Sequence, residues 1–310
     1  MKAAVIGVGY LGKHHARIYS ALEGVELVGV VDPSEEARNS VAREYGTTPY
    51  ADYHDILDKV DVLSVVTPTV THYDIARDCL EAGKDILLEK PIASSVKEAD
   101  DLIREAGIRG RIIQVGHLER YNPALIAMEA MVDTPRFIET ERISPFQGRG
   151  LDVDITLDLM IHDIDIVMGL LGGDRIKDMK VVGSRVLTEN IDAAKAWIEF
   201  ESGASALVTA SRLSGSKSRL LKVHQDGAYL MLDYQQMKIK RYTRSGGKVS
   251  AEEIDIEPKE PLMEEIRDFL DCVRERRRPR VSAQEGRDAL EVALMLSHKI
   301  GKAVSYDKDA

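Results

Sequence analysis

The first residues with chemical potential are three glycines near the start of the chain. Gly7, Gly9 and Gly12 have the spacing G-x-G-x-x-G and lie between an apolar run at 3–6 and a stretch of helical periodicity. In that context the spacing is typical of a dinucleotide site. Gly7 permits the turn out of a strand, Gly9 lets a pyrophosphate approach the backbone, and Gly12 lets the helix pack closely. Other residues of the turn are also expected to contact the cofactor, through the helix N-terminus: Val8, Tyr10 and Leu11.

The acid at position 32 indicates which dinucleotide is bound. Asp32 comes 20 residues after Gly12 and ends a second apolar run at 25–31. A carboxylate there accepts hydrogen bonds from ribose hydroxyls and repels a 2′-phosphate. Residues 33–36 include no arginine or lysine, so NAD is predicted over NADP. FAD is a weaker alternative, because the chain is shorter than most flavin enzymes.

A lysine follows a later apolar run. Lys90 lies in the turn Glu89-Lys90-Pro91, where a predicted parallel strand ends. Ligands bind at the carboxyl edge of such sheets, so this ammonium is placed to hold a substrate hydroxyl and to help move its proton. Taken alone, this lysine is more readily interpreted as a surface lysine at a strand end.

Asp158 and His162 lie four residues apart in a largely apolar segment predicted to be helical over 155–171. That spacing places both on one helix face, and histidine is the usual general base near neutral pH. The alternative is a structural Asp–His pair. Asp163 points away from that face and is expected to contact the other domain, and the role of Asp165 is left open.

Composition limits the class of protein. The 310 residues suffice for two domains, and the net charge of −10 disfavours nucleic-acid and membrane partners. No apolar run approaches the roughly 18 residues that span a membrane. The two distant cysteines suggest a reducing, cytoplasmic compartment, no secretion signal is apparent, and no metal site is predicted.

The pattern of elements changes near residue 118. Before it, short buried strands alternate with helices, which predicts an α/β Rossmann domain with a parallel sheet over residues 1–118. After it, successive strand-like segments with short turns predict an α+β domain over residues 119–310, with a large, mainly antiparallel open sheet. Its strands are expected at 135–144, 180–187, 194–201, 204–211, 220–225, 228–233 and 236–242. The final helices are expected at 261–276 and 283–302, and the last one is expected to pack back on the first domain.

These motifs together resemble the Gfo/Idh/MocA family of NAD(P)-dependent sugar dehydrogenases, nearly end to end. The resemblance rests on Gly7–Gly12, Thr67-Pro68 with His72, Glu89-Lys90-Pro91, and Asp158-x-x-x-His162. It implies that Lys90 contacts substrate and cofactor, that His162 is the acid or base, and that Asp158 binds substrate or assists. It also implies that Thr67 and Pro68 lie against the nicotinamide half of NAD. Which of Lys90 and His162 is the terminal base stays open.

A second segment narrows the resemblance to the branch that acts on nucleotide-linked amino sugars. It runs Gly-His-Leu-Glu-Arg-Tyr-Asn-Pro over residues 116–123. The resemblance implies oxidation of UDP-N-acetylglucosamine at C3, giving a 3-oxo sugar for 3-amino sugars of cell-surface lipopolysaccharide. Arg149, between glycines, is a candidate for the diphosphate, with Arg142 and Arg212 as lesser candidates. The remaining expected substrate contacts are His117, Arg120, Tyr121 and Asn122.

Two rival functions remain open. One is a dehydrogenase of the same family acting on a free sugar or an inositol, and the other is a non-catalytic NAD-dependent sensor or regulator. If the chain acts on a sugar nucleotide, that substrate is expected to bind between the domains, against the antiparallel sheet. A large sheet with one open face usually finds a partner, so a homodimer or homotetramer through the second domain is expected.

Overall fold

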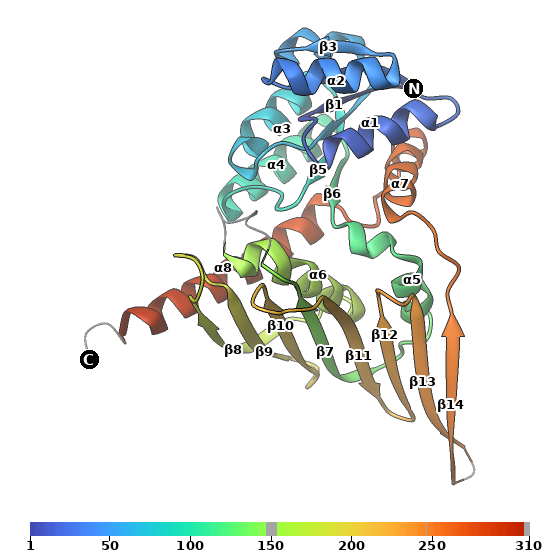
Figure 1. The fold of residues 1–310 in the computed structure, drawn as a ribbon, viewed down its shortest axis with the longest axis vertical. Coiled ribbons are helices and arrows are strands. Elements are labelled where there is room, and N and C mark those ends of the chain that lie inside the picture. The colour runs from blue at the N-terminus through green and yellow to red at the C-terminus, as the bar shows by residue number, and fades with distance from the viewer. Residues whose placement is uncertain (147–153, 246, 307–310) are drawn as a thin grey trace. The chain divides into compact units, whose positions relative to one another are not determined.

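The computed structural model describes residues 1–146, 154–245 and 247–306 (Figure 1). It divides into two compact units. The first unit contains residues 1–118 and 260–288, and the second contains residues 119–259 and the chain from Ala289 onward. The chain therefore leaves the first unit after Leu118 and returns to it at Glu260. No helix in the described ranges is long and apolar enough to cross a membrane.

The first unit is built on a six-stranded parallel sheet with the order β3-β2-β1-β4-β5-β6, which confirms the predicted Rossmann domain. The strand order reverses between β1 and β4, and that switch point is where such sheets bind ligands. The short β3 was not predicted, because its Thr-Pro-Tyr sequence has no apolar run. The strands are β1 (Lys2–Ile6), β2 (Glu26–Val31), β3 (Thr48–Tyr50), β4 (Val62–Val65), β5 (Asp85–Glu89) and β6 (Ile113–Gly116).

Helices cover this sheet, and several have local start and stop signals. The Ser34 hydroxyl accepts from the amide of Ala37 to cap α2. Ser95 and Glu98 form a capping box at the start of α4, which ends at Gly110 in the left-handed conformation. The helices of this unit are α1 (Gly12–Ala21), α2 (Glu35–Tyr45), α3 (His72–Glu81), α4 (Val96–Arg109) and α7 (Pro261–Glu275), with short 3₁₀ turns η1 (Tyr53–Asp55), η2 (Leu57–Lys59) and η3 (Thr69–Thr71).

The second unit contains an eight-stranded sheet with the order β14-β13-β12-β11-β7-β10-β9-β8. It is mainly antiparallel, as predicted, but it is not a simple meander. The first strand in sequence, β7, lies in the middle and pairs parallel with β10 and antiparallel with β11. The strands are β7 (Pro135–Ile143), β8 (Ile176–Ser184), β9 (Ala193–Phe200), β10 (Ser205–Ser211), β11 (Ser218–Gln225), β12 (Ala228–Asp233), β13 (Lys238–Ser245) and β14 (Lys248–Asp255).

One face of this sheet packs on helices and the other is open. Along β7 and β10 every second residue is buried, which gives a core including Ile138, Ala206 and Val208. The helices of this unit lie on the buried side (Figure 1). They are α5 (Pro123–Glu129), the π-helix η5 (Thr156–Met160), α6 (Ile161–Leu170) and the later part of α8 (Ala283–Tyr306), and the turn η4 (Leu118–Tyr121) precedes them. The alternation explains why the second domain reads as strands in sequence.

Candidate dinucleotide and catalytic site

The turn between β1 and α1 shows why glycine stands at each motif position. Gly7 has φ of +85°, and a Cβ there would lie 2.4 Å from the carbonyl oxygen of Val66. A Cβ on Gly12 would lie 1.8 Å from the carbonyl oxygen of Gly7. The fold itself therefore requires both glycines. A Cβ on Gly9 would meet nothing within 4 Å, so the packing of the fold does not require glycine there, and its predicted role beside a ligand stays a prediction.

The start of α1 suits an anion. No side chain caps its N-terminus at Leu11, and its first turn contains no acidic residue, so its dipole and N–H groups are not countered locally. Asp32 lies at the adjoining end of β2. Its two carboxylate oxygens accept from the amides of Val8 and Ser34, each at 2.9 Å. Each oxygen keeps a second lone pair for a ribose hydroxyl, so these residues fit a bound NAD.

The structure also brings a cation to this strand end that sequence reasoning missed. Nη1 of Arg38 donates to the carbonyl oxygens of Pro33 at 3.0 Å and Asp32 at 3.3 Å. Arg38 is six residues beyond Asp32, and the first turn of α2 carries it back to the strand. Residues 33–36 contain no basic side chain, and Arg38 becomes a neighbour of Asp32 only when the first turn of α2 has formed.

The ends of β1, β4 and β5 lie side by side, so three predicted segments converge. Ile6 pairs with Val65, and Val65 pairs with Leu88. The residues that follow these strands are Gly7, Thr67 and Lys90. The amide of Val66 donates to Ile6 at 2.8 Å, which ties the Thr67-Pro68 turn to the glycine turn. The lysine therefore lies at the same sheet edge as the dinucleotide motif, as the sequence predicted.

His72 links two of these segments. The ring is fully buried at the start of α3. Its Nδ1 lies 2.8 Å from the carbonyl oxygen of Pro91, and its Nε2 lies 2.8 Å from that of Thr67. Burial lowers the pKa of His72, although both carbonyls and Glu89 favour the charged ring. Both ring nitrogens of His72 already face backbone oxygens. The expected contact of His72 with NAD stays a prediction.

A chain of buried polar side chains begins at Glu89 and continues through the first unit. No pattern in the sequence predicts it. Glu89 faces Nε2 of His15 at 3.4 Å, and Nδ1 of His15 lies 3.1 Å from the Ser64 hydroxyl. That hydroxyl lies 2.9 Å from the hydroxyl of Tyr19. Burial and the negative charge of Glu89 raise the pKa of the fully buried Glu265 well above its ordinary value. These groups come from α1, β4, β5 and α7, so only tertiary structure assembles them.

In the second unit, Asp158 and His162 lie across a junction between two kinds of helix. Asp158 is in the π-helix η5, and His162 is in the first turn of α6. The predicted continuous α-helix is therefore wrong at its start, where the chain forms a π-helix. Single π turns occur often at functional sites, and both side chains are half-buried. Their catalytic assignment stays a prediction.

Asp163 is part of a buried charge network within the second unit, and it is not the domain contact that was expected. Nε and Nη2 of Arg142 donate to its two oxygens at 3.1 and 2.9 Å. Glu119 accepts from Arg142 at 2.9 Å and from Arg219 at 3.1 Å. Burial opposes ionisation of Glu119, but the two arginines outweigh it and hold its pKa below the usual range. Burial raises the pKa of Asp163, and Arg142 offsets part of the effect.

Two of the three arginines that were candidates for binding a diphosphate are buried beside carboxylates. The guanidinium of Arg142 is buried between two carboxylates, so it is committed to the fold rather than to a ligand. Arg212 is likewise buried, with Nε 3.6 Å from Asp192. Arg149 falls outside the described residues.

The segment that follows β6 also has local structural roles. Nη1 of Arg120 donates to the carbonyl oxygen of Asp165 at 3.1 Å. A Cβ on Gly169 would lie 1.9 Å from Nη1 of Arg120. The side-chain oxygen of Asn122 caps α5 by accepting from Ala124 at 3.0 Å. His117 and Tyr121 are buried. The contacts of these four residues with substrate stay predictions.

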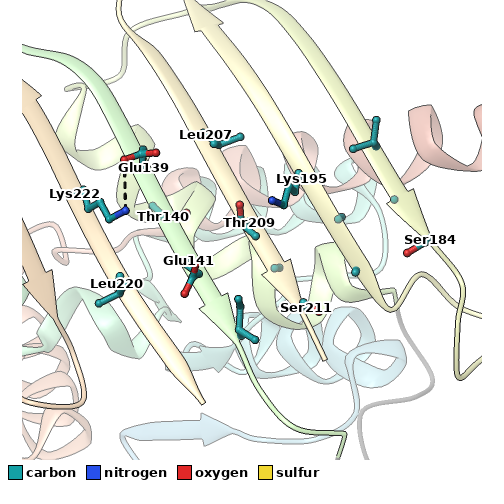
Figure 2. Close-up of a pocket in the computed structure, with 16 residues that line it drawn as sticks. Glu139, Thr140, Glu141, Ser184, Lys195, Leu207, Thr209, Ser211, Leu220 and Lys222 are labelled. Atoms are coloured by element: carbon teal, nitrogen blue, oxygen red, sulfur yellow. Dashed lines mark ion pairs between the residues drawn. The ribbon is translucent and has the colours of Figure 1, made fainter. Parts of the chain in front are cut away.

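A hollow of about 650 Å³ lies on the open face of the second sheet (Figure 2). Its lining comes from β7 to β11 and includes Lys195, Leu207, Thr209 and an ion pair of 3.6 Å between Lys222 and Glu139. None of the predicted catalytic or cofactor residues lines it. This hollow is therefore a feature of the open sheet face and not the site of the predicted chemistry.

Comparison with known proteins matches both units. Residues 1–117 match the model of the oxidoreductase family with an NAD-binding Rossmann fold, and residues 125–230 match the GFO/IDH/MocA C-terminal domain. UDP-N-acetylglucosamine 3-dehydrogenase of Acidithiobacillus ferrooxidans is 34% identical over 303 residues, covering 96% of each chain. scyllo-Inositol 2-dehydrogenase (NAD(+)) of Bacillus subtilis is 28% identical, covering 100% of this chain and 96% of that one.

Solved structures give the same picture. The structure of the Acidithiobacillus ferrooxidans enzyme superposes with a TM-score of 0.92 and covers 97% of both chains. A myo-inositol 2-dehydrogenase from Lactobacillus plantarum superposes with a TM-score of 0.83 at 20% identity, covering 98% of both chains. At that identity, the second likeness concerns the fold alone.

Proposed function

Because the chain belongs to the GFO/IDH/MocA oxidoreductase family, we propose that it oxidises a ring hydroxyl of a nucleotide sugar, with UDP-N-acetylglucosamine oxidised at C3. The observation that carries this proposal is similarity at 34% identity, over 96% of both chains, to an enzyme named for that reaction. The inositol dehydrogenases are less similar, at 28% identity for the one that covers the whole chain, and they define the alternative substrate class.

The chain's own residues have distinct roles in this proposal. NAD, when bound, supplies the hydride acceptor. The Gly9 backbone and the N-terminus of α1 hold its pyrophosphate, and Asp32 holds the adenosine ribose. The ammonium of Lys90, at the carboxyl edge of β5, holds the reacting hydroxyl. The hydroxyl proton passes either to neutral His162 or to Lys90 in its neutral amine form as the C–H bond breaks, and Asp158 orients the sugar.

The catalytic roles are tested with Lys90→Met and His162→Ala, with the affinity for NAD measured separately by calorimetry. Each variant is expected to lose about 10²–10⁴-fold in turnover, the usual contribution of a positioned acid or base. Arg136→Met, at an exposed position at the start of β7, is the control and should remain fully active. Near-normal turnover in both variants, with intact NAD binding, would refute the assignment.

The substrate class is tested by following NADH formation with a panel of UDP-sugars, free sugars and inositols. UDP-N-acetylglucosamine is expected to give the highest kcat/KM. A preference for an inositol or a free sugar would transfer the chain to the alternative class. NAD binding without turnover on any of these compounds would favour a sensor or regulator.

We also propose that the open face of the second sheet pairs two copies of the chain. A row of rings crosses it, with centroids 5.3 Å apart for Trp197 and Phe137, 5.5 Å for Phe137 and His224, and 4.7 Å for His224 and Tyr229. Aromatic residues are enriched in interfaces, and large exposed apolar patches mark them. The hollow beside this row gives room for side chains of a second copy (Figure 2).

Light scattering at micromolar concentration tests this pairing, and a dimer or tetramer is expected. Trp197→Glu should shift the mass towards the monomer. Ile108→Glu, at an even more exposed apolar residue of the first unit, should leave the mass unchanged. A monomeric parent protein would contradict the proposal.

A cytoplasmic location and a role in supplying 3-amino sugars for lipopolysaccharide complete the proposed function. Cys79 and Cys272 are both buried free thiols, which is the usual state in a reducing compartment. A 3-oxo sugar nucleotide is a ketone, and a transaminase must consume it to give the 3-amino sugar. Fractionation of the producing cells, and assay of the product with such an aminotransferase, test these two points.

A further inference from the structure

The ring of His72 spans the two turns on which the proposed chemistry depends. One turn, Thr67-Pro68, follows β4, and the other, Lys90-Pro91, follows β5. The two contacts to carbonyl oxygens are equally short at 2.8 Å, and the ring between them is 0% exposed. The hydroxyl of Thr71, in the turn η3 that precedes α3, lies 2.8 Å from that of Thr67, so the first of these turns is also held by its neighbour in sequence. The backbone of the Lys90 turn is connected to the start of α3 through the imidazole of His72.

Both partners of the ring can only accept hydrogen bonds, and this fact determines where its protons must be. A neutral imidazole has one N–H, so both bonds form together only when the ring is doubly protonated. Five features bear on that charge. Glu89, at the end of β5, favours it, while burial and the N-terminus of α3 oppose it. His15 of α1 also faces Glu89, at 3.4 Å, and competes for its negative charge. Lys90 adjoins Pro91 and adds a positive charge. In the neutral ring, only one carbonyl keeps a donor.

We propose that His72 is a positioning residue for Lys90, with a proton on Nδ1 that holds the Pro91 carbonyl in both charge states of the ring. The opposite end, Nε2, donates to the Thr67 carbonyl when the ring is charged. His72 then acts on the reaction through the backbone of the Lys90 turn, and it needs no contact with substrate. A displacement of about 1 Å in a catalytic group costs on the order of 100-fold in rate, so loss of this hold should be visible in turnover.

Two amide variants separate the ends of the ring. The side-chain nitrogen of Asn lies near the position of Nδ1, and that of Gln lies near the position of Nε2. Because both neighbours are acceptors, the NH₂ group of either amide faces them and its oxygen faces away. His72→Asn therefore retains a donor for Pro91, and His72→Gln retains one for Thr67. His54→Asn is the matched control, because His54 is exposed in the same unit and pairs with Asp52.

The first measurement is hydrogen–deuterium exchange of the peptides covering residues 64–72 and 88–96, together with NAD affinity by calorimetry. Neither readout depends on the substrate. His72→Gln is expected to speed exchange over 88–96, whereas His72→Asn is expected to leave that peptide protected. His72→Asn is expected to speed exchange over 64–72 only at a pH low enough to charge the ring of the parent. His54→Asn should leave both peptides unchanged. Equal behaviour of the two His72 variants, in either direction, overturns the proposal and leaves His72 a packing residue.

The second measurement is steady-state kinetics, and this arm rests on the proposed function. His72→Gln is expected to lose about 10- to 100-fold in kcat with little change in the KM for NAD. His72→Asn is expected to keep kcat within about threefold of the parent, because the donor to the Pro91 carbonyl remains. A large loss of kcat in His72→Asn overturns the assignment of Nδ1. If the parent protein does not turn over UDP-N-acetylglucosamine, the proposed function fails, and the exchange experiment still decides the role of His72.

Discussion

Replacement of Arg142 by Met should be among the most destabilising single substitutions in the second unit. Arg142 and Asp163 are each 3% exposed, and Arg142 donates two hydrogen bonds to Asp163 and one to Glu119. Hydrogen bonds to charged groups contribute about 1.5–3 kcal/mol each, which gives an upper range of about 4.5–9 kcal/mol. Asp163 escapes part of this loss by taking up a proton, and breaking a buried pair typically costs about 3–5 kcal/mol. We expect a loss in that range at pH 7.

The pH dependence of this loss of stability is a separate test of the reasoning about Asp163. In the variant, burial without Arg142 raises the pKa of Asp163 further, so the folded state binds a proton that the unfolded state releases. The penalty is then fully developed at neutral pH and shrinks as the pH falls towards the pKa of an unfolded aspartate, about 3.9. Glu119 acts in the same direction, because the stability that its lowered pKa contributes in the parent is present only above its unfolded value of about 4.3, and removal of Arg142 takes away part of it. We therefore expect the difference between variant and parent to be smaller at pH 5 than at pH 7.

Urea unfolding followed by circular dichroism at both pH values measures the effect. Arg136→Met is the matched control on the same strand, since Arg136 and its partner Asp226 are 62% and 82% exposed. Exposed pairs contribute about 0–1 kcal/mol. Arg142→Met/Asp163→Leu should recover most of the loss, because no unpaired aspartate remains. A loss below about 1 kcal/mol for Arg142→Met, or no recovery in the double variant, would show that the network does not stabilise the unit as argued.

Three further predictions concern the cofactor site and acid stability. Gly9→Ala should leave the unfolding free energy within about 0.5 kcal/mol of the parent, because its Cβ meets no protein atom. It should weaken NAD binding, because the Cβ would keep the pyrophosphate from the backbone. Gly12→Ala should destabilise the fold, and equal stability of the two variants would contradict this. Asp32→Ser should raise the KM for NAD and improve the ratio of NADP to NAD use by about 10-fold or more, since it removes a carboxylate beside Arg38; an unchanged ratio counts against the site. The amides of residues 186–188 bond Asp192 and, against the opposing effect of burial, lower its pKa to about 2. Its contribution to stability is therefore complete above the unfolded pKa of about 3.9 and disappears as the pH falls towards 2, so Asp192→Asn should differ from the parent at pH 7 and converge with it in acid-unfolding curves.

Local signals explain why much of the first unit could be predicted. The glycine spacing, the cap at Ser34 and the capping box at Ser95 each act within a few residues, so their physics is already present in the sequence. The apolar runs of β1, β4 and β5 were found for the same reason, because strands buried on both faces are continuous hydrophobic segments. The position of Lys90 at the sheet edge followed from strand direction alone.

The sequence could not supply the partners that come from distant elements. Arg38 reaches Asp32 only because α2 turns back on its strand, and His72 meets Thr67 and Pro91 only because β4 and β5 are neighbours in the sheet. The π-helix at Thr156–Met160 also has no pattern of its own, since its apolar spacing passes for an ordinary helix.

The sequence by itself determined the class of fold, the NAD motif and the family, because these depend on short-range spacing and on strand and helix periodicity. Only the tertiary structure decided the order of the second sheet and the partners of its buried charges. β7 enters the middle of that sheet, parallel to β10, and brings Arg142 to Asp163. The cost of burying a charge depends on what faces it, and what faces it is fixed by pairing between strands and helices far apart in the chain.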